Sequence, residues 1–340
     1  MTVLFSTHPA FAEHQPGVGH PERPERLRAV VAGVQRSRLD STLVPVSPRP
    51  ATREDLLRVH PAELVDALER FIAEGGGNID ADTAVSSGSW DAALLAAGAG
   101  LDAVDRLDRG EGDAAFCAVR PPGHHATPTR AMGFCLFNNV AVTAAALAHR
   151  GERVLIVDYD AHHGNGTQDV FWRDERVAYV SLHEWPLYPG TGELSETGVG
   201  DGAGWTVNLA LPSGATGDVY RDAVETVVAP LAEEHGSTWL LLSAGFDAHR
   251  ADPLTGLGLT SGDIADITLD LLQLAPPGKR LAFLEGGYDL EALADCTAAC
   301  LVALAGGREA AEAPTSGGAG AHVPAAAAQV HHRAMDSRED

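Results

Sequence analysis

The residues best suited to chemistry are histidines, aspartates and a tyrosine that lie in four short segments. Each segment follows an apolar run: RPPGHH (120–125), DYDAHHGNG (158–166), GFDAH (245–249) and EGGYD (285–289). Open α/β sheets place their functional sites just beyond the carboxyl ends of the strands. Packing alone does not explain polar residues in this position four times over. We therefore interpret the four segments as parts of one site.

Asp160 and His162 are the first candidates for metal ligands. Residues two apart in an extended segment point the same way, so this carboxylate and imidazole can converge on one point. Asp247, from another strand end, would complete a set of two oxygens and one nitrogen. Three protein ligands and an open position suit a catalytic Zn²⁺, although oxygen-rich sites also accept Fe²⁺ or other divalent cations. A single Asp-x-His more often caps a helix or pairs with arginine, and only the combination favours a metal.

A histidine pair and a tyrosine are candidates for proton transfer and charge stabilisation. His124 and His125 follow Pro-Pro-Gly, and adjacent residues usually point to opposite sides, so each is expected to need its own polar partner. Near a metal, such a pair can provide a general base and an electrostatic stabiliser. Tyr288 follows Gly286 and Gly287, which permit close backbone approach. A tyrosine hydroxyl can hydrogen-bond a developing oxyanion.

Two other patterns predict no chemistry. The glycine-rich run at 198–204 precedes an apolar run instead of following one, so it lacks the context of a dinucleotide-binding loop. The four cysteines lie in apolar surroundings without CxxC spacing, and we expect them to be small buried hydrophobes.

The elements that must position these residues follow from the apolar runs. The runs typical of buried strands are 114–119, 153–159, 176–182, 205–211, 238–244 and 280–285. Amphipathic helical patterns are present at 22–38, 89–107, 218–235 and 261–274. Alternating strands and helices predict an α/β fold with a mainly parallel sheet flanked by helices on both faces.

The domain organisation is predicted to be simple. Residues 1–305 read as one catalytic domain. Residues 306–340 read as a Gly/Ala-rich flexible segment and a carboxyl-terminal tail, with a short helix at 324–334.

Composition narrows the classes of partner. The 340 residues carry a net charge of −23 and a single lysine, Lys279. Phosphate backbones require a cationic surface, so we expect no direct nucleic-acid binding. No run approaches the roughly 18 consecutive apolar residues of a membrane helix, and the first residues lack the pattern of a signal peptide. We expect no membrane association and a cytoplasmic location.

The motifs taken together resemble the histone deacetylase superfamily, which includes acetylpolyamine amidohydrolases and acetoin-utilisation proteins. The segments that carry the resemblance, in family order over residues 4–305, are HPERPERL, RPPGHHA, GFCLFNN, VDYDAHHGNGTQ, SLHEWPLYPGTG, SAGFDAHRADPL and EGGYDL. The sequence resembles the class II branch in HHGNG, where Asn165 stands at the position at which class I members have aspartate. The resemblance implies the arginase–deacetylase fold.

The resemblance also assigns site residues, position by position. Asp160, His162 and Asp247 match the zinc ligands, and His124, His125 and Tyr288 match the catalytic residues. The second group comprises Asp158 and Ser181, at a structural K⁺ or Na⁺, and Asn165, which would orient His125. A third group matches the walls of a narrow substrate tunnel: Phe134, Tyr188, Leu254, Gly286 and Gly287. Arg26 resembles a basic residue of an internal channel behind the site.

The function implied is hydrolysis of an acylated amine. Zn²⁺ would polarise the amide and activate water, with His125 as general base, His124 as electrostatic support and Tyr288 as oxyanion donor. Leu254 stands where polyamine-selective relatives often carry an acidic residue, which favours acyl-lysine. Asp80, Asp82, Glu184 or Glu193 could instead select a cationic chain.

Several alternatives stay open at this stage. They are an acetylpolyamine amidohydrolase, a binuclear ureohydrolase of the arginase type, and a zinc-binding sensor or scaffold without turnover. A homo-oligomer, which could narrow the entrance to the site, is also left open.

Overall fold

A parallel β-sheet forms the centre of the protein. The computed structural model describes residues 1–339, and within that range the sheet has eight strands in the order β2-β1-β5-β10-β9-β6-β7-β8, all paired in parallel. Its strands are β1 (Val3–Ser6), β2 (Leu43–Val46), β5 (Ala114–Cys117), β6 (Val154–Asp158), β7 (Val177–Glu184), β8 (Thr206–Leu211), β9 (Trp239–Ala244) and β10 (Arg280–Leu284). A short antiparallel pair, β3 (Gly77–Asn78) and β4 (Ala84–Val85), lies outside it.

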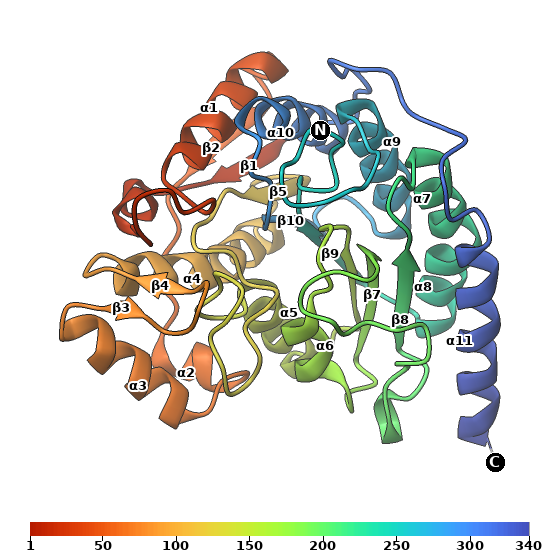
Figure 1. The fold of residues 1–340 in the computed structure, drawn as a ribbon, viewed down its shortest axis with the longest axis horizontal. Coiled ribbons are helices and arrows are strands. Elements are labelled where there is room, and N and C mark those ends of the chain that lie inside the picture. The colour runs from red at the N-terminus through yellow and green to blue at the C-terminus, as the bar shows by residue number, and fades with distance from the viewer. Residues whose placement is uncertain (340) are drawn as a thin grey trace.

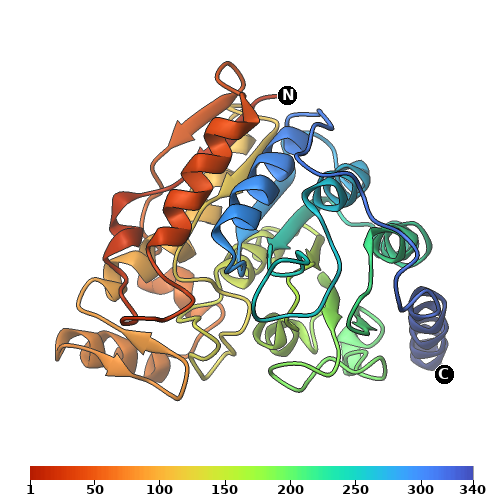
Figure 2. The same cartoon turned by 45° about the horizontal axis from the view of Figure 1, so that its top comes forward.

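Helices cover both faces of this sheet (Figures 1 and 2). The α-helices are α1 (Glu25–Ser37), α2 (Arg53–Leu57), α3 (Ala62–Ala73), α4 (Ser89–Asp108), α5 (Asn139–His149), α6 (Asn165–Phe171), α7 (Gly217–Ala223), α8 (Ala229–His235), α9 (Ser261–Leu271), α10 (Leu290–Leu304) and α11 (Val323–Glu339). Short 3₁₀ turns occur at η1 (Pro9–Glu13), η2 (Gly200–Gly202) and η4 (Leu272–Leu274). Within residues 1–339, none of the helices is both long and apolar enough to span a bilayer.

Two hydrophobic cores result, one on each side of the sheet. Alternate residues of a strand face opposite sides, and in β6 Leu155 and Val157 join one core while Val154 and Ile156 join the other. The first core contains residues of α1 and α7 to α11, and the second contains residues of α2 to α6. Strands buried on both faces account for the continuous apolar runs in the sequence.

The strands that carry the candidate residues are neighbours. β5, β10, β9, β6 and β7 lie next to each other in the sheet although they span residues 114–284. Because all are parallel, the segments that follow them meet at one edge. The prediction of an α/β fold with a mainly parallel sheet flanked by helices on both faces is confirmed.

The sequence did not predict the strands β1 to β4 or the helices α2, α3, α5, α6 and α10, and one expected helix is divided. β2 is an edge strand of four partly exposed residues that include Pro45, so it does not form a recognisable apolar run. The helix expected at 218–235 is divided by a π-helical turn, η3 (Val224–Val228). Pro230 lies just beyond this turn and has no N–H to donate to the preceding turn, which accounts for the change in helical geometry.

The segment that follows α10 lies along the molecule and makes specific contacts. Glu312 accepts hydrogen bonds from His249 Nε2 at 2.7 Å and from Arg250 Nη2 at 2.6 Å. Thr315 Oγ1 donates to Asp263 Oδ2 at 2.7 Å. α11 then packs beside β8 (Figure 1), with Val323 and Ala327 in the first core. This helix has 17 residues, and is therefore longer than the short helix expected at 324–334.

The single lysine lies at the amino ends of the strands, whereas the candidate site lies at their carboxyl ends. Lys279 immediately precedes β10, and its ammonium group lies 3.4 Å from carboxylate oxygens of Asp108 and Glu152. The ammonium also lies 4.3 Å from the centroid of the Trp239 ring, a cation–π contact.

Candidate functional site

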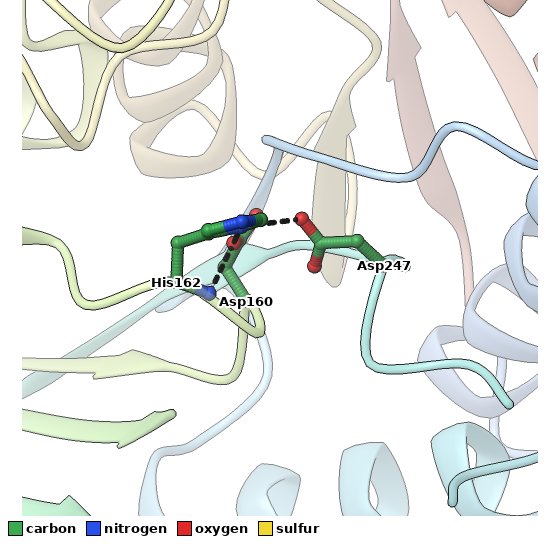
Figure 3. A group of neighbouring side chains, drawn as sticks. All are labelled: Asp160, His162 and Asp247. Atoms are coloured by element: carbon green, nitrogen blue, oxygen red, sulfur yellow. Dashed lines mark hydrogen bonds and ion pairs between the residues drawn. The ribbon is translucent and has the colours of Figure 1, made fainter. Parts of the chain in front are cut away.

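Asp160, His162 and Asp247 form a compact group at the carboxyl edge of the sheet. Asp160 and His162 come from the loop after β6, and Asp247 comes from the loop after the neighbouring β9. Figure 3 shows the three side chains turned toward one another. His162 Nδ1 lies 3.0 Å from Asp247 Oδ2 and 3.2 Å from Asp160 Oδ1. One potential ligand atom from each residue lies within 4.8 Å of the other two.

The electrostatics of this group fit a divalent cation. Both carboxylates are fully buried, and in the described part of the chain their ion pairs are with His162 and His124 alone. Burial, followed by the charge of Asp160, raises the pKa of Asp247 to about 7. A cation between the two carboxylates would relieve both effects. Two carboxylates and one imidazole suit Zn²⁺ or Fe²⁺.

The backbone closes tightly around the two carboxylates. Gly286 N donates to Asp160 Oδ2 at 2.8 Å, and Ala161 N donates to Asp247 Oδ1 at 2.8 Å. A Cβ at Gly286 would lie 2.1 Å from Asp247 Oδ2, closer than any side chain allows. Glycine is therefore required at position 286 by close approach to the ligands.

His124 and His125 lie beside the group, each with its own partner. Their rings face each other with centroids 4.0 Å apart, so the expectation that they point to opposite sides is wrong. The chain turns at this point instead of running extended. His124 Nδ1 lies 3.0 Å from Asp158 Oδ2, and His125 Nδ1 lies 2.8 Å from Asn165 Oδ1.

The surroundings of the two histidines shift their pKa values in opposite directions. Burial lowers the pKa of His124, but the charges of Asp158 and Asp160 outweigh it and raise that pKa to about 10. Burial and the positive charge of His124 hold the pKa of His125 well below its usual range. The amide oxygen of Asn165 can only accept a hydrogen bond, so His125 carries its proton on Nδ1. Its Nε2 is then free to accept a proton.

Glu285 holds the backbone of the segment that carries the histidine pair. The sequence alone assigned this residue no role. This buried carboxylate follows β10 and accepts hydrogen bonds from Gly123 N at 2.7 Å and from His124 N at 3.2 Å. Burial raises its pKa to about 7. The only sequence signal for a role of Glu285 is its position directly before Gly286-Gly287-Tyr288.

Tyr288 lies on the loop after β10, between Phe134 and Arg26. Its ring centroid is 5.9 Å from that of Phe134, and the Arg26 guanidinium lies 5.1 Å from it. Arg26 is fully buried and its Nε donates to Gly287 O at 2.7 Å. Burial raises the pKa of the Tyr288 phenol well above its usual value. The hydroxyl therefore keeps its proton and can act as a donor.

The residues proposed for the tunnel walls lie around this centre. Tyr188 makes an edge contact with His125, with ring centroids 5.2 Å apart, and is 37% exposed. Phe134 adopts a left-handed backbone with φ of 67°, a conformation that costs about 1–3 kcal/mol in a non-glycine residue and is concentrated at functional sites. Leu254 is 39% exposed on the loop after β9. Tyr188 therefore lies beside the buried His125 and Phe134 beside Tyr288, while Tyr188 and Leu254 are exposed.

The remaining residues proposed from the sequence also lie nearby. Asp158 and Ser181 are opposite each other in the β6–β7 register, and both are fully buried. Ser181 Oγ is 2.9 Å from His183 Nδ1. Glu184 is buried and accepts from Gly256 N at 2.6 Å, so its carboxylate is committed to the loop that carries Leu254.

His60 provides a pH-dependent contribution to the stability of the loop that contains the histidine pair. It is fully buried, its Nε2 accepts from Asn138 N at 2.9 Å, and its Nδ1 donates to Pro128 O at 3.2 Å. Burial lowers its pKa to about 4. Between about pH 6.5 and pH 4 the unfolded chain binds a proton here that the folded chain does not, so the free energy of unfolding falls as the pH falls.

His60 alone is therefore predicted to lower the free energy of unfolding by about 3 kcal/mol when the pH falls from about 6.5 to about 4. We expect His60→Gln to be less stable than wild type above pH 7 but to lose less stability on acidification. Urea unfolding of both proteins at stepped pH values measures the difference between the two slopes. Equal slopes would contradict the prediction.

The comparisons with known proteins agree with this arrangement. A family model described as "Histone deacetylase domain" matches residues 20–304. The chain is 39% identical over 306 residues to a probable deacetylase of Archaeoglobus fulgidus, covering 88% of this chain and 85% of the relative. It is 36% identical over 302 residues to a histone deacetylase-like amidohydrolase of Pseudomonas aeruginosa, covering 87% and 80%. The crystal structure of the HDA15 HD domain superposes with a TM-score of 0.89 at 35% identity, covering 98% of this chain and 96% of that one.

Proposed function

Because the chain belongs to the histone deacetylase family and has its arginase–deacetylase fold, we propose that it is a zinc-dependent hydrolase of acylated amines, with acyl-lysine as the preferred class of substrate. The observation that carries this proposal is the group Asp160, His162 and Asp247 beside two histidines whose pKa values are shifted in opposite directions. Within the described residues this is the one such group of potential ligands, which favours a single metal over the binuclear centre of a ureohydrolase.

A divalent cation held by the three ligands would supply Lewis-acid chemistry, polarising an amide carbonyl and making water acidic enough to attack it near neutral pH. The protein's own residues account for the other requirements. His125 takes the proton of the attacking water on Nε2 and delivers it to the departing amine, a role worth about 10²- to 10⁴-fold. Asn165 holds the tautomer that makes this possible.

His124 and Tyr288 stabilise charge in the same reaction. His124 stays positively charged beside Asp158 and lies next to the base, where it offsets negative charge that develops on the substrate. Tyr288 donates its hydroxyl proton in a hydrogen bond to the oxyanion. A K⁺ or Na⁺ close to Asp158 and Ser181 is part of the proposal, supported by the fully buried carboxylate and hydroxyl on neighbouring strands.

An exposed apolar residue favours acyl-lysine, whose acylated side chain carries no charge, over an acetylpolyamine. Burial raises the pKa of Tyr188, and the negative charges of Asp82 and Asp80 raise it further. Asp80 pairs with Arg130 at 3.3 Å. Leu254, exposed on the loop after β9, offers an apolar contact instead of a charge. Such a contact suits the neutral side chain of acyl-lysine better than the secondary ammonium of a polyamine.

The test compares substrates on the metal-loaded protein. A fluorogenic acetyl-lysine peptide, N-acetylputrescine and N8-acetylspermidine are assayed side by side, with Leu254→Glu as the designed variant. We expect kcat/KM to be highest for the peptide with wild type. Leu254→Glu should gain on the acetylpolyamines by about 5-fold, since one new ion pair at a partly exposed site is worth about 1 kcal/mol.

The results of these assays distinguish the proposed function from an acetylpolyamine amidohydrolase and from a sensor without turnover. Preference of wild type for acetylpolyamines would overturn the substrate class and identify an acetylpolyamine amidohydrolase. A metal-loaded protein that binds acylated amines in calorimetry but turns none over would overturn catalysis and favour a sensor.

A further inference from the structure

Asp252 connects two loops of the site, and neither the motif reasoning nor the family assignment gives it a role. It lies on the loop after β9, five residues beyond Asp247, and is 7% exposed. Its Oδ2 accepts hydrogen bonds from Tyr288 N at 2.7 Å and from Asp289 N at 3.3 Å. Its Oδ1 accepts from Leu254 N at 3.0 Å. One carboxylate therefore satisfies three backbone donors from two loops.

Within residues 1–339, the amides of Tyr288 and Asp289 have no acceptor in their own loop and donate to Asp252 instead. Asp289 is the N-cap of α10, and its side chain accepts from Ala292 N at 2.9 Å. Tyr288 N and Asp289 N precede the first turn of that helix, where backbone N–H groups are not used by the helix itself. Removing the carboxylate would leave both donors without acceptor in a partly buried place, at a cost in free energy.

The carbonyl side of the same loop is held independently. Arg26 Nε donates to Gly287 O, and Arg26 Nη2 donates to Glu285 O. Gly287, one of the two residues held, has φ of 118°, which residues other than glycine rarely adopt. Arg26 thus fixes the carbonyls of the loop and Asp252 fixes its N–H groups, with the Tyr288 side chain between them.

The loop that carries Asp252 is itself anchored. Asp252 N donates to His249 O at 2.8 Å, and Ala251 N donates to His249 Nδ1 at 3.1 Å. Since that nitrogen accepts, the ring proton of His249 is on Nε2 and is donated to Glu312. Asp252 therefore has a fixed place from which it can orient another loop.

We propose that Asp252 is a positioning residue for Tyr288: its carboxylate sets the backbone from which the phenol reaches the reacting carbonyl. The proposal rests on the proposed deacylase function. A displacement of about 1 Å at a catalytic group can reduce the rate by about 10²-fold. Loss of Asp252 should therefore reduce kcat and leave the bound metal in place.

A double-mutant cycle tests this proposal. The proteins are wild type, Asp252→Ala, Tyr288→Phe and the double variant, assayed on the fluorogenic acetyl-lysine peptide. We expect Asp252→Ala to lower kcat by about 10- to 100-fold with KM changed by less than about 3-fold. In the Tyr288→Phe background the same substitution should lower kcat by less than about 3-fold, because the group that it positions is already absent.

Asp55→Ala is the matched control. Asp55 is also 7% exposed and also accepts a backbone hydrogen bond, from Thr52 N at 2.9 Å, but it lies in α2, remote from the site. It should lower the melting temperature without lowering kcat. Asp252→Asn is the milder variant: its amide oxygen can accept from Tyr288 N, so part of kcat should return.

A second measurement does not depend on turnover. Hydrogen–deuterium exchange of peptides covering 285–290 should become faster in Asp252→Ala and stay unchanged in Asp55→Ala. Equal losses of kcat in the wild-type and Tyr288→Phe backgrounds would overturn the proposal, as would unchanged exchange. A wild-type protein inert on every acylated amine would refute the proposed function, while the exchange experiment would still test the contact.

Discussion

Replacing Tyr288 by phenylalanine is expected to lower kcat by about 10²- to 10³-fold, the usual effect of removing one oxyanion donor. The substitution removes a single oxygen and keeps the ring that packs between Phe134 and Arg26. The loop is held through its backbone by Asp252 and Arg26, so it should not move. KM, the melting temperature and the metal content should therefore stay close to those of wild type.

Tyr220→Phe is the matched control for this prediction. Tyr220 is fully buried, and its hydroxyl has no hydrogen-bond partner among the described residues. Removal of that oxygen should leave kcat unchanged. Steady-state kinetics on the acetyl-lysine peptide and metal analysis of the same preparations decide the matter. A Tyr288→Phe protein with more than about a tenth of wild-type kcat would exclude the hydroxyl as the main oxyanion donor.

The second large effect concerns Asp247, one of the proposed metal ligands. Asp247→Asn should lower activity by more than about 10³-fold, because a Lewis acid contributes several kcal/mol to amide hydrolysis. Chelation should reduce wild-type activity to a similar level. Added Zn²⁺ should restore wild type and not the variant. Reconstitution with Fe²⁺ under anaerobic conditions determines which ion gives the higher activity.

Stability gives an independent measure of the same site. A ligand that binds only the folded state stabilises it, so Zn²⁺ should raise the melting temperature of wild type. Asp247→Asn removes one of two adjacent buried carboxylates. Without metal, the variant should be at least as stable as wild type because repulsion between the carboxylates is lost. Metal-free wild type that is clearly more stable than the variant, with no shift on adding Zn²⁺, would contradict a metal site.

Sequence reasoning identified the strands of the site because they are buried on both faces. Continuous aliphatic runs such as 153–159 have few other interpretations, and the polar residues directly after them are conspicuous for the same reason. Asp160 and His162 share one loop, so their spacing alone predicted that they converge. Asp247 lies 85 residues beyond His162, and its place followed only from the parallel topology.

The parts that sequence did not predict depend on contacts between distant loops. Asp252 and Tyr288 are 36 residues apart, and no periodicity relates them. The rings of His124 and His125 face each other because the chain turns after Gly123, which the assumption of an extended segment missed. Residues 306–322 have the composition of a linker, yet Glu312 and Thr315 bind partners on two other elements. Composition indicates how much conformational entropy a segment loses when it becomes ordered. It does not reveal the hydrogen-bond partners that can offset this loss.

The single lysine has a practical consequence for testing the proposed lysine deacylase activity. Lys279 offers the only side-chain amine in the sequence, and it lies before β10, at the edge of the sheet away from the reacting groups. Acyl-lysine formed on the protein itself can arise only at this position, so a mass-spectrometric assay of a lysine-rich substrate has almost no background from the enzyme. Coupling through the same amine to a sensor surface would leave the entrance to the site facing the solution.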